Sequence, residues 1–294
     1  MKRVRTVVIG ANGSVGRLLC SILVDHEAEL ICIDLESSHV PADTQYIAAD
    51  AKALPATAIS AIRSAQCILI CLPESVALTA LPAILDNMSP GALWVDTLSI
   101  KSQVCLELAG RLSSREAISI NPMFAPSLSL EQRNIVVIPI AIGPLSKQFL
   151  TMLQSCGAIL THMSAEDHDR LTAAIQVATH AAIISFGMAL MNASYNIESA
   201  MRIATPVHLT LLSFIARILT LNHEVYWDIQ YDNPYAEDVR QKLIGAMTDL
   251  DRIIRSGNLE AFQTVIEGLR ALIEPKHDRL AGIASQLLSQ VDLQ

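Results

Sequence analysis

The sequence contains few aromatic residues and no run of basic residues. Phe, Trp and Tyr make up 4% of its 294 residues, and 29 Asp and Glu outnumber 21 Lys and Arg, which gives a formal net charge of -8. A protein that binds a nucleic-acid backbone needs a concentrated positive surface to neutralise the phosphates. We therefore expect no nucleic-acid partner.

Signals for export, membrane insertion and metal binding are also missing from the sequence. Each uninterrupted apolar run is shorter than the roughly 18 residues that a membrane span needs, and the first run ends in glycines rather than at a small-residue cleavage site. The six cysteines form no CxxC pair and have no histidine at metal-ligand spacing. The sequence thus predicts a soluble cytoplasmic protein with reduced cysteines, no membrane association and no metal.

The first half of the chain alternates short apolar runs with segments of helical pattern. This alternation is typical of strands joined by crossover helices, which form a parallel sheet covered on both faces. The sequence therefore predicts an α/β fold with an N-terminal, Rossmann-like, doubly wound parallel sheet. The expected strands are 6–10, 29–35, 68–73, 92–97, 117–121, 134–141 and 158–163, with helices at 15–25 and 146–153.

The second half is expected to form an all-helical domain. Glycine and proline become sparse after Ser164, which with Asp167 three residues later forms a helix N-cap signal. We place the domains at 1–164 and 165–294. Segment 171–192 is apolar on nearly every face, which a helix tolerates only when it is buried all round. This favours a homodimer through the helical domain; a central helix within one subunit is the alternative.

A glycine-rich turn joins the first strand to the first helix. In such a turn, backbone N–H groups and the positive helix N-terminus can hold the pyrophosphate of a dinucleotide. Gly13 would let the backbone approach the phosphate, and Gly16 would let the helix pack on the strand. The predicted cofactor-binding residues here and after the strand at 68–73 are Gly10, Asn12, Gly13, Ser14, Val15, Gly16, Leu72 and Pro73.

The second strand supplies an acidic residue at the position expected for a dinucleotide site. Asp34 lies 18 residues beyond Gly16, where its carboxylate can accept hydrogen bonds from both ribose hydroxyls. The same carboxylate would repel a 2'-phosphate, and no arginine follows it to neutralise one. NAD is therefore the predicted cofactor, in preference to NADP.

Three further motifs lie at 96–101 (DTLSIK), 121–126 (NPMFAP) and 167–180, where Asp-His-Asp is followed by Gln176 and His180. In order and spacing they resemble the prephenate dehydrogenase family, whose patterns read D-x-x-S-x-K, H-P-M-F-G-P and E-H-D with Q-x-x-x-H. A fourth stretch, 204–230, extends the resemblance, which covers about residues 5–270. It implies an NAD-dependent oxidative decarboxylation in which hydride leaves C4 of a cyclohexadiene dicarboxylate while the ring carboxylate departs as CO2.

The resemblance also implies roles for single residues. Ser99 would bond the C4 substituent of the substrate, and Arg217 would bind a substrate carboxylate through its bidentate guanidinium fork. Gln176 and His180 would line the substrate pocket. Without the resemblance, the simpler interpretation of His180 is a hydrogen-bonded histidine in the core. His168 stands among charged residues at a helix start, where a solvated side chain is the simpler interpretation.

The chain departs from the family pattern at three positions. Asn121 replaces the catalytic histidine, Leu209 stands at a position where the family has an arginine, and Ala125 replaces a glycine. Asparagine cannot act as a general base at neutral pH. For a substrate with a C4 hydroxyl, a positioned base is worth about 10²–10⁴ in rate. Loss of the histidine is therefore costly for a prephenate oxidase.

An amine at C4 removes the need for that base. The lone pair of a neutral amine can itself expel hydride, and the preceding loss of a proton from the ammonium can occur to water. Asn121 could orient the amine, and would be catalytic together with Ser99. The sequence thus predicts 4-amino-4-deoxyprephenate as substrate, with 4-aminophenylpyruvate, CO2 and NADH as products, in a pathway to antibiotic precursors.

Two other functions remain open at this point. The first is a prephenate or arogenate dehydrogenase of tyrosine biosynthesis that uses another base, for instance His180 or a water held by Ser99. The second is a catalytically inactive NAD-binding sensor or assembly partner, in which the family histidine is lost because no chemistry is needed. Retention of Ser99, His180 and Arg217 argues against an inactive protein.

Overall fold

The computed structural model describes residues 3–39, 41, 44–220 and 223–291. The chain folds as two compact units, Met1–Leu171 and Thr172–Gln294, called unit 1 and unit 2 below. The division falls at the end of helix α6 (Ala165–Thr172). The sequence-based limits of 1–164 and 165–294 stay a prediction.

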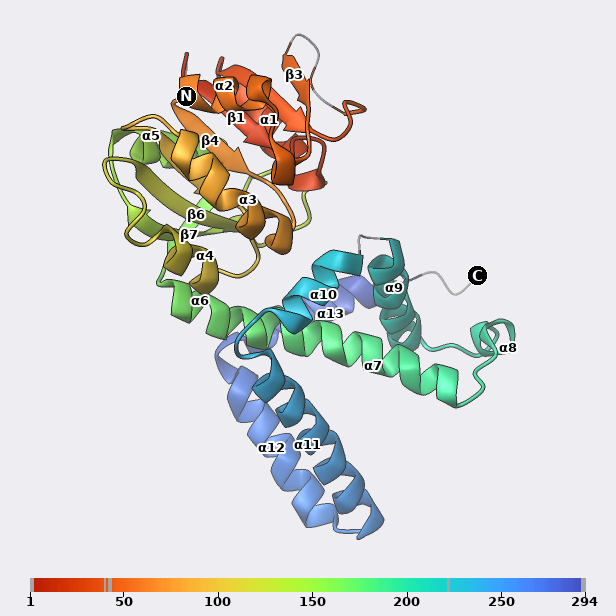
Figure 1. Cartoon of the computed structure of the whole chain (residues 1–294). Helices are drawn as coiled ribbons and strands as arrows, with labels where there is room; N and C mark the ends of the chain where they lie inside the picture. Colours follow the sequence, from red (N-terminus) through yellow and green to blue (C-terminus); the bar gives the residue numbers. More distant parts are fainter. Residues whose placement is uncertain (1–2, 40, 42–43, 221–222, 292–294) are drawn as a thin grey trace. The chain divides into compact units, whose positions relative to one another are not determined.

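Unit 1 is built on a sheet that orders its described strands β3-β2-β1-β4-β5-β6-β7-β8 (Figure 1). All the predicted strands form. An additional edge strand, β3, has a half-exposed sequence, QYIA, that carries no strong strand signal. The strands are β1 (Arg5–Ile9), β2 (Glu29–Asp34), β3 (Gln45–Ala48), β4 (Cys67–Ile70), β5 (Leu93–Asp96), β6 (Glu116–Pro122), β7 (Asn134–Ala141) and β8 (Ile159–His162).

The sheet is parallel except at one pair of neighbouring strands. Strands β1 to β6 pair in parallel, but β7 runs antiparallel to β6, and β8 is parallel to β7. Parallel neighbours need a crossover of a dozen or more residues, usually a helix. The connection 123–133 between β6 and β7 contains no helix, so the chain reverses direction after β6 and β7 pairs with it antiparallel. The doubly wound character is otherwise confirmed.

Helices cover both faces of the sheet. On one face, Leu19 and Leu23 of α1 and Phe149 of α5 pack with Val8 and other strand residues. On the other face, helices α2, α3 and α4 supply a second apolar layer around the buried Trp94 of β5. The helices are α1 (Ser14–Asp25), α2 (Ala56–Ser64), α3 (Glu74–Asn87), α4 (Ser102–Leu108) and α5 (Pro144–Ser155).

Unit 2 is helical in its described part, as predicted. A π-helical turn, Ala173–Val177, continues α6 into α7 (Ala178–Asn192), and a small core forms around Ala173, Val177 and Ile229. The N-cap predicted upstream is confirmed, since the Asp167 N–H donates to Ser164 Oγ at 3.0 Å. The remaining helices are α8 (Ile197–Met201), α9 (Pro206–Thr220), α10 (His223–Tyr231), α11 (Ala236–Arg255), α12 (Leu259–Ile273) and α13 (His277–Ser289).

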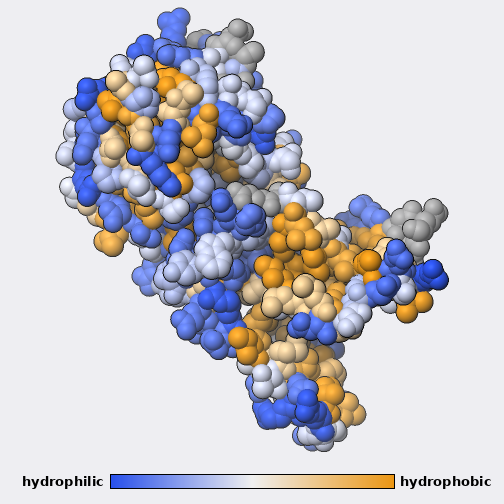
Figure 2. All heavy atoms as spheres, turned by 45° about the vertical axis from the view of Figure 1, so that its right-hand side comes forward, coloured by the Kyte–Doolittle hydropathy of each residue, from blue (hydrophilic) through white to orange (hydrophobic). Residues whose placement is uncertain are grey.

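Apolar side chains are widely exposed on unit 2 (Figure 2). No described residue of α7 or α9 is buried, and Met191 and Leu219 are among the exposed apolar side chains. By length and composition alone, the helix Ala165–Asn192 could cross a membrane. The uninterrupted apolar runs are shorter than a span, but isolated polar residues such as Gln176 separate them without making the helix polar on average. Almost none of the most apolar stretch of this helix is buried within the chain.

The packing of α1 on β1 gives a test of the fold. A Cβ at Gly16 would lie 2.1 Å from the backbone oxygen of Gly10 and 2.9 Å from the Cα of Ala11. We expect Gly16→Ala to destabilise the protein by about 1–3 kcal/mol, because the helix must move away from the strand. In Gly13→Ala, whose Cβ would meet its nearest atom at an ordinary 3.4 Å, the change should stay below about 1 kcal/mol. Thermal unfolding without added ligand measures both; equal melting temperatures would contradict this packing.

Candidate functional site

A pocket of about 340 Å3 lies at the carboxyl ends of strands β1, β2 and β4. Ligands in doubly wound folds bind at this edge of the sheet. Gly10 turns the chain there with a φ of 85°, and a Cβ would lie 2.2 Å from the backbone oxygen of Cys71, so the position needs glycine. Of the predicted cofactor residues, the pocket wall includes Gly10, Gly13, Asp34, Leu72 and Pro73.

The polar groups of this pocket fit a dinucleotide. Asp34 accepts hydrogen bonds from the N–H groups of Asn12, at 2.8 Å, and Leu35, at 2.7 Å, which fix its carboxylate at the pocket wall. Gly13 is the N-cap of α1, so the N–H groups of Ser14, Val15 and Gly16 form its first turn. Asn12 Oδ1 is buried and accepts no hydrogen bond from the described residues. A glycine-rich turn at a helix N-terminus suits a pyrophosphate, and the unused amide oxygen of Asn12 suits a hydroxyl or N–H donor of a ligand.

A buried ion pair lies at the carboxyl end of β5. Lys101 is fully buried; its Nζ donates to the backbone oxygen of Ile120 at 2.7 Å and lies 3.5 Å from Asp96 Oδ1. Burial lowers the pKa of Lys101, and the Asp96 carboxylate opposes that shift. Asp96 also accepts from Trp94 Nε1, at 3.1 Å, and from the hydroxyl of Ser119. These bonds tie the segment after β5 to strand β6.

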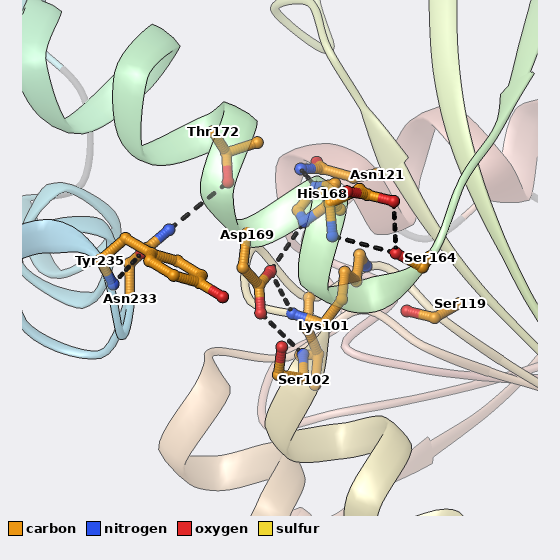
Figure 3. Close-up of polar contacts among 12 residues, drawn as sticks. Lys101, Ser102, Ser119, Asn121, Ser164, His168, Asp169, Thr172, Asn233 and Tyr235 are labelled. Atoms are coloured by element: carbon orange, nitrogen blue, oxygen red, sulfur yellow. Dashed lines mark hydrogen bonds and ion pairs between the residues drawn. The ribbon is translucent and has the colours of Figure 1, made fainter.

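Asn121, near the end of β6, belongs to a chain of buried hydrogen bonds (Figure 3). Its Nδ2 lies 3.0 Å from His168 Nε2, and His168 Nδ1 lies 2.8 Å from Asp169 Oδ1. Asp169 in turn accepts from the backbone N–H groups of Lys101, at 2.9 Å, and Ser102, at 2.8 Å. The histidine and the aspartate are fully buried, and Asn121 is 6% exposed.

The charge states along this chain follow from its surroundings. Burial lowers the pKa of His168, although the hydrogen bond to Asp169 opposes the shift, so the ring is neutral at neutral pH. Burial on its own would raise the pKa of Asp169, but hydrogen bonds from His168, Ser102 and Lys101 bring it below its ordinary value. Asp169 is therefore a carboxylate that can only accept hydrogen bonds.

Ser99 lies between two anchored points of the chain. It belongs to the loop that follows β5, between Asp96 and Lys101, and is half-buried. In the part of the chain that the structure describes, no side-chain hydrogen bond involves Ser99, so its hydroxyl is available to a ligand. Within unit 1, Ser99 follows the carboxyl end of β5 and Asn121 lies near the carboxyl end of β6, and these two parallel strands are neighbours.

Unit 2 holds the other three predicted site residues. Gln176 lies in the π-helical turn, and His180 follows on α7, one turn later. His180 packs edge-on against the ring of Tyr226, with centroids 4.7 Å apart. Burial and the nearby positive charge of Arg217 both lower the pKa of His180. Its Nδ1 is buried and has no hydrogen-bond partner among the described residues, which leaves a polar atom for a ligand.

Comparison with known proteins agrees with the motifs. A family model described as the prephenate dehydrogenase dimerization domain matches residues 164–268. A 4-amino-4-deoxyprephenate dehydrogenase of Streptomyces pristinaespiralis is 34% identical over 269 residues, which are 92% of this chain and 91% of the relative. The chain belongs to the prephenate dehydrogenase family.

Other relatives are more distant in sequence, and solved structures of two enzymes share the fold. The probable arogenate/prephenate dehydrogenase of Methanocaldococcus jannaschii is 24% identical over 216 residues, 71% of this chain and 48% of the relative. Prephenate dehydrogenase from A. aeolicus, solved with hydroxyphenyl propionate and NAD+, aligns with a TM-score of 0.69 at 16% identity, over 95% of this chain and 98% of that one. Synechocystis arogenate dehydrogenase aligns with a TM-score of 0.64 at 19% identity, over 95% and 99%.

The structure corrects one expectation for the family motifs and adds residues to the site. A solvated His168 was the simpler interpretation, and it is wrong, since the ring is fully buried. Sequence reasoning also missed the roles of Asp169 and Lys101 in holding the chain around Asn121. Their signal was present, because both lie inside the family motifs at 96–101 and 167–180, but spacing alone cannot show that the motifs meet.

The buried Lys101–Asp96 pair gives a second test. Lys101→Met leaves Asp96 without its cation, and breaking a buried pair on one side costs about 3–5 kcal/mol. Lys242→Met removes an exposed pair with Asp238, at 2.6 Å, and should cost less than about 1 kcal/mol. Urea unfolding followed by tryptophan fluorescence measures both, because Trp94 lies in unit 1 with Lys101 and Trp227 lies in unit 2 with Lys242. Equal unfolding free energies for the two variants would refute a stabilising role for the buried pair.

Proposed function

We propose that this protein catalyses the NAD-dependent oxidative decarboxylation of 4-amino-4-deoxyprephenate to 4-aminophenylpyruvate. The observation that carries the proposal is Asn121 at the position of the family's catalytic histidine, held by a neutral His168 at 3.0 Å. Support also comes from the 34% identity with the 4-amino-4-deoxyprephenate dehydrogenase of Streptomyces pristinaespiralis.

The glycine turn and Asp34 would hold NAD. The first turn of α1 would bind the pyrophosphate, and the Asp34 carboxylate would bind the ribose hydroxyls and repel a 2'-phosphate. Leu72 and Pro73 would contact the cofactor from the loop after β4. When bound, NAD supplies an acceptor for one hydride.

The residues around C4 of the substrate supply orientation and no base. Asn121 has no lone pair that can take a proton at neutral pH, and both ring nitrogens of His168 already take part in hydrogen bonds. The amine lone pair expels hydride from C4. The bond between the ring and its carboxylate then breaks, its electron pair enters the ring, and CO2 leaves as the ring becomes aromatic. Starting from the neutral amine, no proton has to leave with the hydride.

The carboxylates of the substrate require cationic or neutral donors. Arg217 offers a bidentate fork for one carboxylate. The buried Nδ1 of His180 and the amide of Gln176 offer further hydrogen bonds, and Ser99 would donate to or accept from the C4 substituent. The lowered pKa of His180 keeps the ring neutral at neutral pH, so Arg217 carries the positive charge.

His180 supports a second candidate function, a prephenate or arogenate dehydrogenase. A neutral imidazole with one nitrogen free of other bonds is a competent general base. In that case His180, and not Asn121, would accept the hydroxyl proton of the substrate. His180→Gln would then abolish turnover, whereas a role in binding alone would mainly raise KM.

The helical unit would form a homodimer. Its exposed apolar residues need a cover, and the matched family model is that of a dimerization domain. The apolar helix Ala165–Asn192 lies entirely within that match, so a second copy of the chain accounts for its exposed face without a membrane.

The substrate assignment is tested by comparing kcat/KM for 4-amino-4-deoxyprephenate and prephenate, followed through NADH formation. We expect a preference for the amine of about 10²-fold or more, since only the hydroxyl substrate needs the missing base. Asn121→His should raise kcat/KM for prephenate by about tenfold or more.

Asn87→His is the matched control. Asn87 lies at the end of α3, where it accepts a hydrogen bond from Arg63, and its replacement should change neither activity. Prephenate turnover equal to or better than amine turnover would refute the assignment. Tight NAD binding with no turnover of either compound would point to the inactive NAD-binding protein instead.

A further inference from the structure

The chain Asp169–His168–Asn121 fixes the direction of each of its hydrogen bonds. Asp169 Oδ1 accepts the backbone N–H of Lys101 and faces His168 Nδ1, while Oδ2 accepts the N–H of Ser102. Two backbone donors aimed at one carboxyl group hold it as a carboxylate. A carboxylate has no proton to give, so the proton between Asp169 and His168 belongs to Nδ1 of the histidine.

The state of His168 then determines the orientation of Asn121. The charged groups that act on the ring are Asp169, Asp96 and Lys101, and burial is the largest influence, so the ring holds one proton. With that proton on Nδ1, Nε2 has only a lone pair and must accept. The group that faces it at 3.0 Å is Asn121 Nδ2, which donates. The amide oxygen of Asn121 therefore points away from His168.

We propose that Asp169 and His168 are positioning residues that lock the Asn121 side chain with its amide oxygen, Oδ1, directed at the C4 substituent of the substrate. This inference rests on the proposed function for the nature of that substituent, a nitrogen that carries N–H donors. No hydrogen bond among the described residues uses Asn121 Oδ1, so it is available to accept one. In the opposite orientation, Asn121 Nδ2 would face the substrate amine. Its N–H groups would then donate a hydrogen bond to the amine lone pair that has to expel hydride.

The lock has a consequence for selectivity. When Asn121 Oδ1 accepts a hydrogen bond from an N–H group of the amine, the amine lone pair makes no hydrogen bond to the protein. The lone pair then stays aligned with the C4–H bond that releases hydride. An amide free to rotate would donate to that lone pair for part of the time and slow hydride loss. The positioning residues therefore act on the chemical step and leave cofactor and substrate binding unchanged.

The protonation pattern is tested directly on the wild-type protein by nitrogen NMR of labelled histidine. We expect His168 to carry a proton on Nδ1 and a bare Nε2 near neutral pH, and its Nε2 signal to shift in Asn121→Ala, which assigns it. A proton on Nε2, or on both nitrogens, would overturn the inference, because Asn121 would then have to present its oxygen to the ring.

A double-mutant cycle tests the effect on catalysis. His168→Leu removes the acceptor, and we expect kcat to fall about tenfold with KM and the NAD Kd changed less than about threefold. In an Asn121→Ala background the same change should alter kcat by less than about twofold, since no amide is left to orient. An equal fall in both backgrounds would show a structural role only and overturn the proposal.

His26→Leu is the matched control for the cycle. His26 follows helix α1 and is half-buried, with its ring bonded to the backbone oxygen of Ile22 at 2.9 Å. The effect of His26→Leu on kcat, whatever its size, should be the same in the wild-type protein and in the Asn121→Ala variant. The cycle is run with the diene that is turned over better. If that diene is prephenate, the proposed substrate fails, while coupling between His168 and Asn121 would still establish the positioning role.

Discussion

Asp169 accepts hydrogen bonds from two successive backbone N–H groups and from the ring of His168, and the polar residues around Asn121 depend on it. The two backbone donors belong to Lys101 and Ser102, at the start of α4. A helix N-terminus favours a negative charge, which adds to the effect of the hydrogen bonds. One buried carboxylate thus anchors the loop after β5 to helix α6 and sets the tautomer of His168. The same carboxylate therefore acts on the loop that carries Ser99 and, through His168, on the side chain of Asn121.

The parallel sheet explains why these residues meet. Strands β1, β2, β4, β5 and β6 all end at the same edge, so segments up to about a hundred residues apart in sequence supply one surface. Gly10 and Asp34 follow β1 and end β2, Asp96 ends β5, and Asn121 lies near the end of β6. Nucleotide binding and the amide at position 121 are thereby brought to one edge of unit 1. The substitution of histidine by Asn121 changes the chemistry of that edge and leaves its framework intact.

The fold was largely predictable from the sequence, because buried parallel strands read as short apolar runs and the glycine turn marks the first crossover. The antiparallel β7 was not, since nothing in its apolar pattern differs from a parallel strand; only the short connection 123–133 reveals the reversal. In the site, the place of Asp34 was predictable from its spacing to the glycine turn, and it lies in the pocket wall. The role of Arg217, implied by the family resemblance, stays a prediction.

The burial of His168 and Asp169 could not be predicted from hydrophobic periodicity. On helix α6 the buried positions are His168, Asp169 and Thr172, all of them polar, so this face gives no apolar pattern. Their exposed neighbours Glu166 and Arg170 make the segment look solvated. Polar residues are buried here because each finds a partner in another motif of the chain, and such pairing is a property of the folded structure.

The proposed reaction oxidises an amine without a protein base, and the pH dependence of kcat/KM for 4-amino-4-deoxyprephenate tests this chemistry. We expect kcat/KM to rise about tenfold per pH unit toward the pKa of the substrate ammonium, which is near 10 for an unperturbed alkylamine, with no break at lower pH. A profile that levels off above about pH 7 would instead reveal a histidine acting as the base, and oxidation without a protein base would be refuted.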